Sequence, residues 1–432
     1  MFVIILKKIR KTIGVLLEIK LFEFFDCVIK FIYVYGFLIK SKIYSSILTV
    51  NIHDFIIKLT IFFFTEETAM EKEKNKKIGK IIALSVVGVL VVIIGIALLI
   101  FQGELRTILS VDADTENGIY NIDYVADYKL DQLLEEGGVN NEDELAQYIL
   151  RIMLKGLPIN IEYEVPQLAC STFIAETPEK GYIFGRNLDN QLTDLAVVKT
   201  APKNGYKSVS VVNLSFLGYN DTYTPEALMD RIVTLGVPYF PLDGVNEKGL
   251  AVGVLQLQAP PTNQQTDKVD VGTTLAIRIL LDKASTVKEA VDMLSNFDMH
   301  ASANGCFHLQ IVDATGDSVV VSYVNNEMVV TEKEGKYQAA TNFYLHDVPF
   351  EYEKQGEDRY AVLMNTLKEN DGVLTAEEGM GLLNSVSFKE TPPDEEGRVY
   401  STQWSSIYDL INPSLTLCAD RDYENPITYT VD

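Results

Sequence analysis

The chain has 432 residues, of which 47% are hydrophobic, so it is long enough for one large domain with appended segments and apolar enough for a sizeable core. Its formal net charge of -23 is unevenly divided: residues 1–102 carry 14 Lys and Arg against 8 Asp and Glu, whereas residues 103–432 carry 23 against 52. Nucleic acid is excluded as an expected partner of this acidic body, because phosphate backbones bind basic surfaces.

The first segment, residues 1–69, is rich in Ile, Phe, Lys and Tyr but has neither a clean amphipathic nor a clean membrane pattern. Its most apolar part is interrupted by Glu23, Asp26 and Lys30, and ionisable groups are costly at the centre of a bilayer. Met70 stands directly before a lysine-rich stretch and is a natural start. We therefore predict that residues 1–69 are a doubtful extension rather than a domain.

Residues 70–102 read as a basic flank followed by a transmembrane helix. The run 81–101 is apolar, carries no charge and is long enough to cross a hydrocarbon core. Positive charge beside a span stays in the cytoplasm, which predicts a single-pass protein of the cell membrane with its acidic body on the extracytoplasmic side. A cleavable signal peptide is the alternative, but the run exceeds a usual signal and no small-residue cleavage site follows it.

Residues 103–169 form an acidic segment with 4 basic and 14 acidic residues. A helix is predicted over 141–154, because Leu145, Ile149 and Met153 recur four apart and Asn141 can cap the first turn. Two interpretations stay open for the segment. It is either a propeptide that packs on the following domain or a stalk.

Strand-rich and helical stretches alternate from residue 170 onward. Strands are predicted at 171–176, 182–186, 207–216, 250–257, 308–312, 318–324, 328–331, 403–408 and 415–418, and helices at 273–284, 287–297, 357–367 and 376–383. Asn246 and Gly249 predict a hairpin turn. Strand runs separated by helix pairs predict an α+β domain over 170–432, with two stacked sheets and helices outside, an αββα sandwich.

Cys170 opens a predicted hairpin whose turn lies at 177–181. Folding back at this turn returns Arg186 and Asp189 to the neighbourhood of the thiol. A guanidinium favours the thiolate, whereas a carboxylate disfavours it, so the better partner for Asp189 is a cation such as Arg186 or an α-amino group. Cys170 is therefore a candidate nucleophile; the alternative is a small buried apolar residue beside an ordinary ion pair.

The stretch 170–190 resembles the start of the mature chain in the choloylglycine hydrolase family, the N-terminal-nucleophile amidases that include bile acid hydrolases, penicillin V acylases and acid ceramidase-like enzymes. In that family a Gly-Arg-x-x-Asp element follows the first cysteine, matched here by Gly185, Arg186 and Asp189. Further blocks agree in order at 246–250, 308–313 with Gly316, 341–342 and Arg359. The resemblance covers residues 170–432 and implies the αββα sandwich of N-terminal-nucleophile hydrolases.

The resemblance also implies roles for residues near the nucleophile. Cys170 would attack the substrate with its own α-amine as general base, Asp189 would bind that amine, and Arg186 would sit against the thiol. Because Cys170 is internal, the resemblance requires cleavage between Ala169 and Cys170, for which an N-to-S acyl shift by the same thiol is the favoured route.

Three more residues complete the implied site. Asn342 would donate its side-chain amide to the oxyanion, the backbone amide of Gln256 would complete the oxyanion hole, and Arg359 would support the cluster from outside. Two departures are visible: bile acid hydrolases often have Asn where this chain has Gln256, and only 16 residues separate Asn342 from Arg359. The long assembly loop of those enzymes is therefore missing, so their tetramer is not expected, and the oligomeric state stays open.

The predicted function is that of a self-processing cysteine amidase that hydrolyses a linear N-acyl amide, a small-molecule substrate, through a thioester on Cys170. An acyltransferase on the same scaffold and a catalytically silent, membrane-anchored binding protein are the alternatives. Residues 191–195, 217–223 and 258–261 are candidates to line the acyl pocket, with Tyr219 and Tyr223 able to stack on a flat group.

The remaining cysteines and histidines predict no metal site and no cofactor, since none has zinc-ligand spacing. Cys306 and Cys418 are predicted to be buried thiols rather than a disulfide pair, and His308 a packed core histidine.

Overall fold

The computed structural model describes residues 72–114, 117–152, 169–220, 222–393, 397 and 399–432. The chain divides into two compact units, Met1–Val89 and Leu90–Asp432. The predicted extension 1–69 and the end of the acidic segment, 153–168, lie outside the described residues. Helix α4 (Lys72–Ile100) contains the predicted apolar run except its last residue, Phe101. Its window Ala83–Ile100 has a mean hydropathy of 3.1, so the helix is long and apolar enough to span a membrane.

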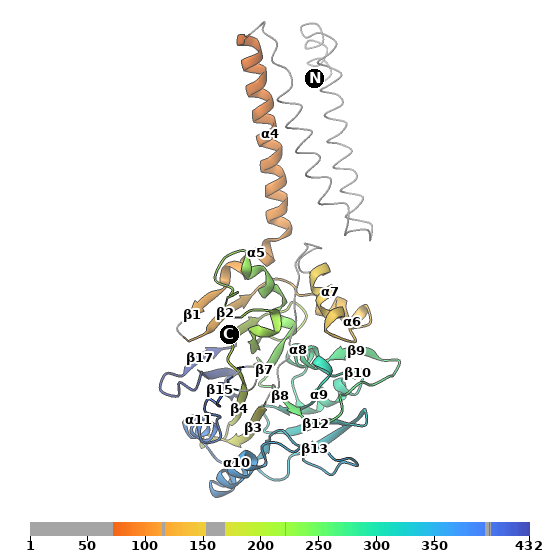
Figure 1. Ribbon diagram of the computed structural model, residues 1–432, viewed down its shortest axis with the longest axis vertical. Coiled ribbons are helices and arrows are strands. Elements are labelled where there is room, and N and C mark those ends of the chain that lie inside the picture. The colour runs from red at the N-terminus through yellow and green to blue at the C-terminus, as the bar shows by residue number, and fades with distance from the viewer. Residues whose placement is uncertain (1–71, 115–116, 153–168, 221, 394–396, 398) are drawn as a thin grey trace. The chain divides into compact units, whose positions relative to one another are not determined.

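Two large sheets form the body of the second unit (Figure 1). The larger sheet has the strand order β1-β2-β5-β6-β7-β8-β11-β12-β13, with bounds β1 (Asp112–Asp114), β2 (Ile119–Tyr124), β5 (Leu195–Thr200), β6 (Ser208–Asn213), β7 (Pro241–Asn246), β8 (Ala251–Leu257), β11 (Cys306–Val312), β12 (Ser318–Val324) and β13 (Glu327–Glu332). The smaller sheet has the order β14-β3-β4-β15-β16-β17, with bounds β14 (Gln338–Ala340), β3 (Ala169–Glu176), β4 (Tyr182–Gln191), β15 (Tyr400–Asp409), β16 (Ser414–Ala419) and β17 (Ile427–Thr430). A separate parallel pair joins β9 (Val269–Gly272) to β10 (Phe297–His300).

Helices cover the outer face of each sheet, which agrees with the predicted layering. Helices α8 (Thr273–Lys283) and α9 (Val287–Leu294) pack on the larger sheet, and α10 (Glu357–Glu369) and α11 (Ala376–Ser385) pack on the smaller one. The sheets face each other, with β3 against β8. The other helices are α5 (Gln102–Ser110), α6 (Leu130–Glu135) and α7 (Glu142–Ile152), with 3₁₀ turns η1 (Leu214–Leu217), η2 (Asp230–Tyr239) and η3 (Ser302–Asn304).

Both faces of the β3–β4 hairpin are buried, because it lies in an inner layer. Side chains alternate across a strand, so Ile174 joins the core between the sheets while Phe173 joins the core under α10 and α11. The hairpin register places Cys170 opposite Leu188 and Thr172 opposite Arg186. The hairpin prediction is confirmed, and both strands extend beyond their predicted ends.

The acidic segment upstream of the nucleophile is built into the larger sheet. Strand β2 pairs in parallel with β5, and the hydroxyl of Tyr124 on β2 donates a 2.7 Å hydrogen bond to the carbonyl of Leu235. Helix α7 falls within the predicted 141–154, and the side chain of Asn141 accepts the predicted capping hydrogen bond from the Glu144 amide at 3.0 Å. The sequence predicted this helix but missed β2, whose partner lies about 75 residues away in the chain, far beyond the reach of local patterns.

The predicted turn at Asn246 and Gly249 is confirmed. The Gly249 amide donates to the Asn246 carbonyl at 2.9 Å, and Gly249 has a φ of +78°. The Asn246 side chain donates to the carbonyls of Leu281 and Ala284 at 3.0 and 2.8 Å, and so caps the C-terminus of α8. A Cβ on Gly249 would lie 2.0 Å from the carbonyl oxygen of Leu410, so this turn also requires a close backbone approach.

Replacing Gly249 with alanine should destabilise the fold more than the same change at Gly335. Both glycines have a positive φ, near +80°, but a Cβ on Gly335 would meet nothing within 4 Å. The left-handed conformation alone costs alanine about 1 kcal/mol, and the backbone clash at position 249 should add about 1–3 kcal/mol. Urea unfolding of Gly249→Ala and Gly335→Ala measures the difference; equal destabilisation would contradict the close approach to Leu410.

Candidate active site

The fold brings together all six residues that the sequence singled out. Cys170 lies on β3, Arg186 and Asp189 on β4, Gln256 on β8, Asn342 after β14, and Arg359 on α10. Cys170, Arg186, Asp189, Asn342 and Arg359 are buried.

The thiol of Cys170 lies between the two sheets and is fully buried. The nearest guanidinium nitrogen of Arg186 is 3.9 Å from the sulfur, so the predicted pairing is present. Burial is nevertheless the largest influence and raises the pKa of the thiol to about 11, while Arg186 and a backbone hydrogen bond from Gln256 lower the pKa and Asp189 raises it. Arg186 therefore lowers the pKa of the thiol, as predicted. In the intact chain burial raises this pKa by more, so the thiol is protonated.

Arg186 is held by a carboxylate that the sequence analysis missed. Its Nε is ion-paired with Asp243 on β7, and its Nη1 donates to the Val254 carbonyl at 2.6 Å. Asp243 also accepts hydrogen bonds from the indole of Trp404 at 3.0 Å and from the hydroxyl of Tyr408. The guanidinium is thus fixed in position beside the sulfur of Cys170.

Asp189 and Arg359 form a second buried ion pair, on the face of the hairpin turned toward α10. Nη1 of Arg359 is 3.1 Å from a carboxylate oxygen of Asp189, and the other carboxylate oxygen accepts a hydrogen bond from Thr402. Burial raises the pKa of the Asp189 carboxyl to about 6, against the opposing influence of Arg359, Thr402 and Arg186. Thr402 is another partner that the sequence analysis missed.

Arg359 and Asn342 hold the backbone of Cys170. Arg359 donates to the carbonyl of Cys170 at 2.7 Å and to the hydroxyl of Ser171 at 2.8 Å. The side-chain oxygen of Asn342 accepts from the amide of Cys170 and from Nη2 of Arg359, each at 2.8 Å. The amide nitrogen of Asn342 donates to the carbonyl of Gln256 at 2.8 Å, so in this state that donor is already paired.

The two residues missed by sequence reasoning share one difficulty. Asp243 and Thr402 are polar residues inside strands, and each meets its partner on another strand far away in the chain. A weak signal existed for Asp243, because a carboxylate in an otherwise apolar strand has to be paired when it is buried.

Several secondary predictions have clear outcomes. Cys306 and Cys418 are buried free thiols, as predicted. His308 is a buried histidine whose Nε2 lies 2.7 Å from the Thr341 carbonyl, and burial lowers the pKa of its ring to about 4. Tyr219 is buried and stacked on Tyr223, with ring centroids 5.0 Å apart, so in this conformation it does not offer a free face to a substrate.

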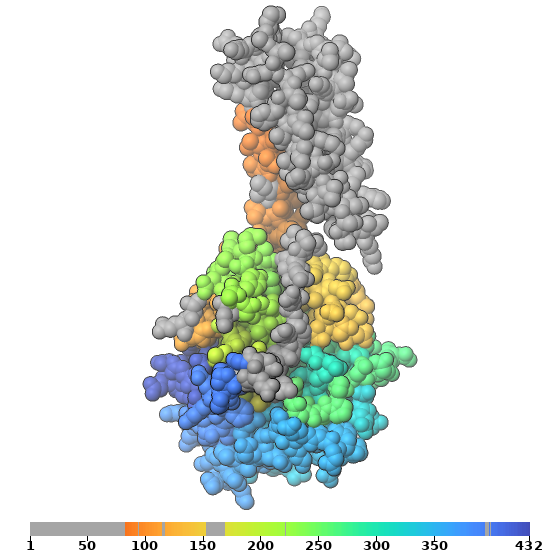
Figure 2. Space-filling view, viewed as in Figure 1, coloured from red at the N-terminus to blue at the C-terminus, as the bar shows by residue number. Residues whose placement is uncertain are grey.

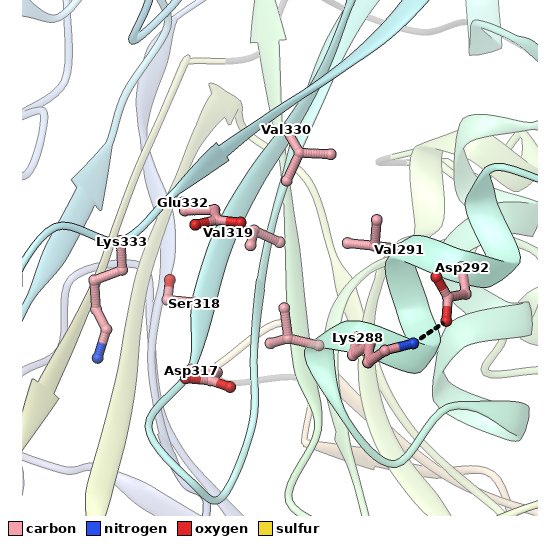
Figure 3. Close-up of a pocket in the computed structure, with 10 residues that line it drawn as sticks. Lys288, Val291, Asp292, Asp317, Ser318, Val319, Val330, Glu332 and Lys333 are labelled. Atoms are coloured by element: carbon pink, nitrogen blue, oxygen red, sulfur yellow. Dashed lines mark hydrogen bonds and ion pairs between the residues drawn. The ribbon is translucent and has the colours of Figure 1, made fainter.

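Two surface pockets lie elsewhere on the domain. One, of about 350 Å³, is bounded by α9, β12 and β13, where Lys288 is ion-paired with Asp292 and lies opposite Val330 and Glu332 (Figure 3). Another, of about 460 Å³, is bounded by residues 125–135, 201–204 and 282–283. Neither is lined by any of the six predicted site residues.

The fold and the cluster together define a candidate cysteine-nucleophile site. Residues 170–370 match the model of the family described as linear amide C-N hydrolases, choloylglycine hydrolase family. This region of the chain is similar to that family, as the sequence motifs predicted.

Individual relatives match over shorter or more divergent stretches. Penicillin V acylase of Pectobacterium atrosepticum is 32% identical over 111 residues, which are 23% of this chain and 29% of that protein, so the chain spans less than a third of this relative. A mutant of conjugated bile acid hydrolase from Clostridium perfringens is 18% identical, with a TM-score of 0.46, over 60% of this chain and 92% of its own. Penicillin V acylase from Agrobacterium tumefaciens is 16% identical, with a TM-score of 0.38, over 60% of this chain and 84% of its own.

The buried carboxyl of Asp189 should leave a signature in stability against pH. Its pKa is about 6 in the folded chain and 3.8 in the unfolded chain, so the folded state binds more protons between these values and loses stability as the pH rises through them. Relative to Asp189→Asn, whose side chain cannot ionise, the unfolding free energy should fall by up to about 3 kcal/mol between pH 3.5 and 7.

Urea unfolding across this pH range, in a Cys170→Ala background that keeps every chain intact, measures the difference. Asp358→Asn, which removes the carboxylate of an exposed neighbour of Arg359, is the matched control. If the difference in unfolding free energy between wild type and Asp189→Asn does not change with pH, then burial does not raise the pKa of the Asp189 carboxyl.

Proposed function

We propose that the chain is a self-processing cysteine amidase that hydrolyses a linear, non-peptide N-acyl amide through a thioester on Cys170. The observation that carries the proposal is the set of contacts that converges on this residue: Arg186 at its sulfur, Asn342 at its nitrogen and Arg359 at its carbonyl. The match of residues 170–370 to a family of linear amide C-N hydrolases supports the reaction class. The names of the relatives supply two acyl groups to test, penicillin V and conjugated bile acids.

The first step is cleavage of the peptide bond between Ala169 and Cys170. The thiol sulfur attacks the Ala169 carbonyl carbon, the bond from that carbon to the Cys170 nitrogen breaks, and the nitrogen takes up a proton. Water then hydrolyses the resulting thioester, which leaves a carboxylate on Ala169 and a free amine and thiol on Cys170. Asn342 holds the Cys170 nitrogen of this bond, and Arg359 holds the carbonyl on the other side of Cys170.

The cut supplies the base that the intact chain lacks. A peptide nitrogen is not basic, whereas a free α-amine has a pKa of about 8 and can accept the thiol proton near neutral pH. Desolvation favours the neutral thiol of Cys170 until that transfer occurs, after which Arg186 stabilises the thiolate. Asp189 lies opposite Ala169 in the β3–β4 ladder, close to where the new ammonium group would form.

Amide hydrolysis then follows the usual course of an acyl-enzyme reaction. The thiolate attacks the substrate carbonyl, the Cys170 ammonium returns its proton to the leaving amine, and water resolves the thioester. The oxyanion donors would be the backbone amide of Gln256 and the side-chain amide of Asn342. For Asn342 this requires exchange of its present acceptor, the Gln256 carbonyl, for the oxyanion.

The apolar helix α4 would anchor the enzyme in the cell membrane, with the acidic body on the extracytoplasmic side. Its length and hydropathy support this placement, and the lysines before it support the orientation. The ladder between β2 and β5 would keep the upstream fragment bound after the cut. The processed enzyme would therefore remain at the membrane as two associated fragments.

N-terminal sequencing and intact mass of the purified protein test the processing step. Wild type should yield a second N-terminus at Cys170, and Cys170→Ala should stay as one chain, because no thiol is present to attack. The two wild-type fragments should co-elute in gel filtration because β2 stays paired. An uncut wild-type chain would remove the proposed base and overturn the mechanism.

Replacing Arg186 with lysine should lower kcat/KM for a chromogenic acyl amide by about 100-fold, because a lysine cannot contact Asp243, the Val254 carbonyl and the sulfur together. Because the thiolate is then less stabilised, the acidic limb of the pH–rate profile should move to higher pH. Arg151→Lys, on the exposed face of α7, is the control and should behave as wild type. Activity of Arg186→Lys within a few-fold of wild type would contradict the role of Arg186 in stabilising the thiolate.

Adding an amine acceptor to the same assay separates hydrolysis from acyl transfer.

A further inference from the structure

Three ligand-type side chains meet outside the candidate active site, where β9 and β10 pair. Asp270 lies directly opposite Asp298 in the parallel ladder, and His300 lies two residues further along β10, on the same face. Nε2 of His300 is 2.8 Å from Oδ1 of Asp270 and 3.2 Å from Oδ1 of Asp298. Sequence patterns did not indicate this cluster, because 27 residues separate Asp270 from Asp298.

The hydrogen bonds around His300 determine which ring nitrogen carries a proton. The side-chain nitrogen of Gln265 donates to the Gln264 carbonyl at 2.8 Å, which orients that amide, and also to Oδ1 of Asn263 at 3.2 Å. Oδ1 of Asn263 is therefore an acceptor. Nδ1 of His300 lies 2.7 Å from this same oxygen and must be the donor.

Nε2 of His300 consequently faces two carboxylate oxygens. In the neutral ring Nε2 would present a lone pair to both, which is repulsive, so the geometry calls for a cation between them. Asp298 is 99% buried, and its Oδ1 accepts no hydrogen bond from any residue that the structure describes, whereas its Oδ2 accepts from the Thr266 amide. A buried carboxylate oxygen and an imidazole lone pair that face each other can both bind one metal ion placed between them.

We propose that Asp270, Asp298 and His300 bind a divalent transition-metal ion of the Zn²⁺ type. Zinc bonds to imidazole nitrogen and carboxylate oxygen are about 2.0–2.2 Å long, which places neighbouring ligand atoms of a tetrahedral site about 3.3–3.6 Å apart. The observed separations of 2.8 and 3.2 Å are slightly shorter, so the two carboxylate oxygens would move outward by a few tenths of an ångström when the metal binds. An imidazole with two carboxylates favours such a metal over Mg²⁺ or Ca²⁺, which prefer oxygen ligands throughout.

The surroundings also suit a metal. Two carboxylates neutralise its charge, and the contact of Nδ1 with Asn263 is the outer hydrogen bond that orients a metal-binding histidine. The side chain of Asp270 is 28% exposed, whereas His300 and Asp298 are buried. Water can therefore enter from the Asp270 side and complete the coordination.

The site would tie the segment upstream of the nucleophile to the rest of the domain. The backbone of Asp270 pairs with the link between α6 and α7: its carbonyl accepts from the Val139 amide at 2.9 Å, and its amide donates to the Gly137 carbonyl at 3.2 Å. Figure 2 shows α6 and α7 in yellow beside the teal region that contains β9 and β10. The inferred role is structural, since a metal that fixes Asp270 also fixes the strand against which this link docks.

Zinc titration of the full-length protein, solubilised in detergent and stripped with EDTA, tests the proposal. Competition with a chromogenic chelator gives the stoichiometry and Kd, and a thermal melt of the same samples gives the shift in Tm. The test variant is Asp298→Asn, which keeps the shape but loses the charge. The controls are Asp292→Asn, an exposed carboxylate, and Cys170→Ala, which removes the competing thiol ligand.

Wild type, Asp292→Asn and Cys170→Ala should each bind one Zn²⁺ per chain and melt several degrees higher with zinc than after EDTA. Asp298→Asn should bind at least about 100-fold more weakly and lose the zinc-dependent shift. If Asp298→Asn does not fold, Asp270→Asn, at the exposed edge, replaces it with the same expectation. Equal zinc affinity in wild type and the ligand variant, loss of binding in Cys170→Ala, or a wild-type Tm that does not respond to zinc would overturn the proposal and leave a proton on His300 as the cation.

Discussion

The ion pair between Arg186 and Asp243 joins the two sheets at the centre of the fold. Arg186 comes from β4 of the smaller sheet and Asp243 from β7 of the larger one, and both are fully buried. Removing one partner of such a pair typically costs about 3–5 kcal/mol, because it leaves an uncompensated charge in a medium of low polarity. Trp404 and Tyr408 donate hydrogen bonds to the same carboxylate, one to each of its oxygens, so both oxygens of Asp243 are paired. The sandwich and the electrostatics at Cys170 therefore depend on one contact.

The two faces of the β3–β4 hairpin carry different charged contacts to Cys170. On the face between the sheets, Arg186 acts on the sulfur of Cys170. On the face toward α10, Arg359 and Asp189 act near its backbone. Because alternate residues of a strand point to opposite faces, a carboxylate can lie close to the nitrogen of Cys170 while a guanidinium lies closer to its sulfur. Desolvation still dominates at the sulfur, as the raised pKa of the thiol shows.

Much of this arrangement could be predicted from sequence, for reasons that differ from residue to residue. The hairpin that pairs Cys170 with Leu188 follows from local turn chemistry, and the cap at Asn141 follows from helix periodicity. The grouping of Asn342 and Arg359 with the nucleophile came from ordered family motifs, since no local rule joins residues more than 170 positions apart. Asp243 and the Asp270 cluster were missed because their partners are set by strand order in space. The raised pKa of the Cys170 thiol was not predicted, because the burial that raises it depends on the whole fold and not on residues nearby in the sequence.

The parallel ladder between β2 and β5 has a further consequence for how the domain can be handled as a fragment. A chain trimmed to begin at Cys170 would lack β1 and β2 and would leave β5 (Leu195–Thr200) as an open edge, with the strongly apolar pair Val197 and Val198 in its middle. Unpaired apolar edges recruit strands from other molecules, so such a fragment would tend to aggregate. The boundary of the soluble folding unit is therefore set by a strand that lies about 50 residues before the nucleophile, outside the region that matches the family.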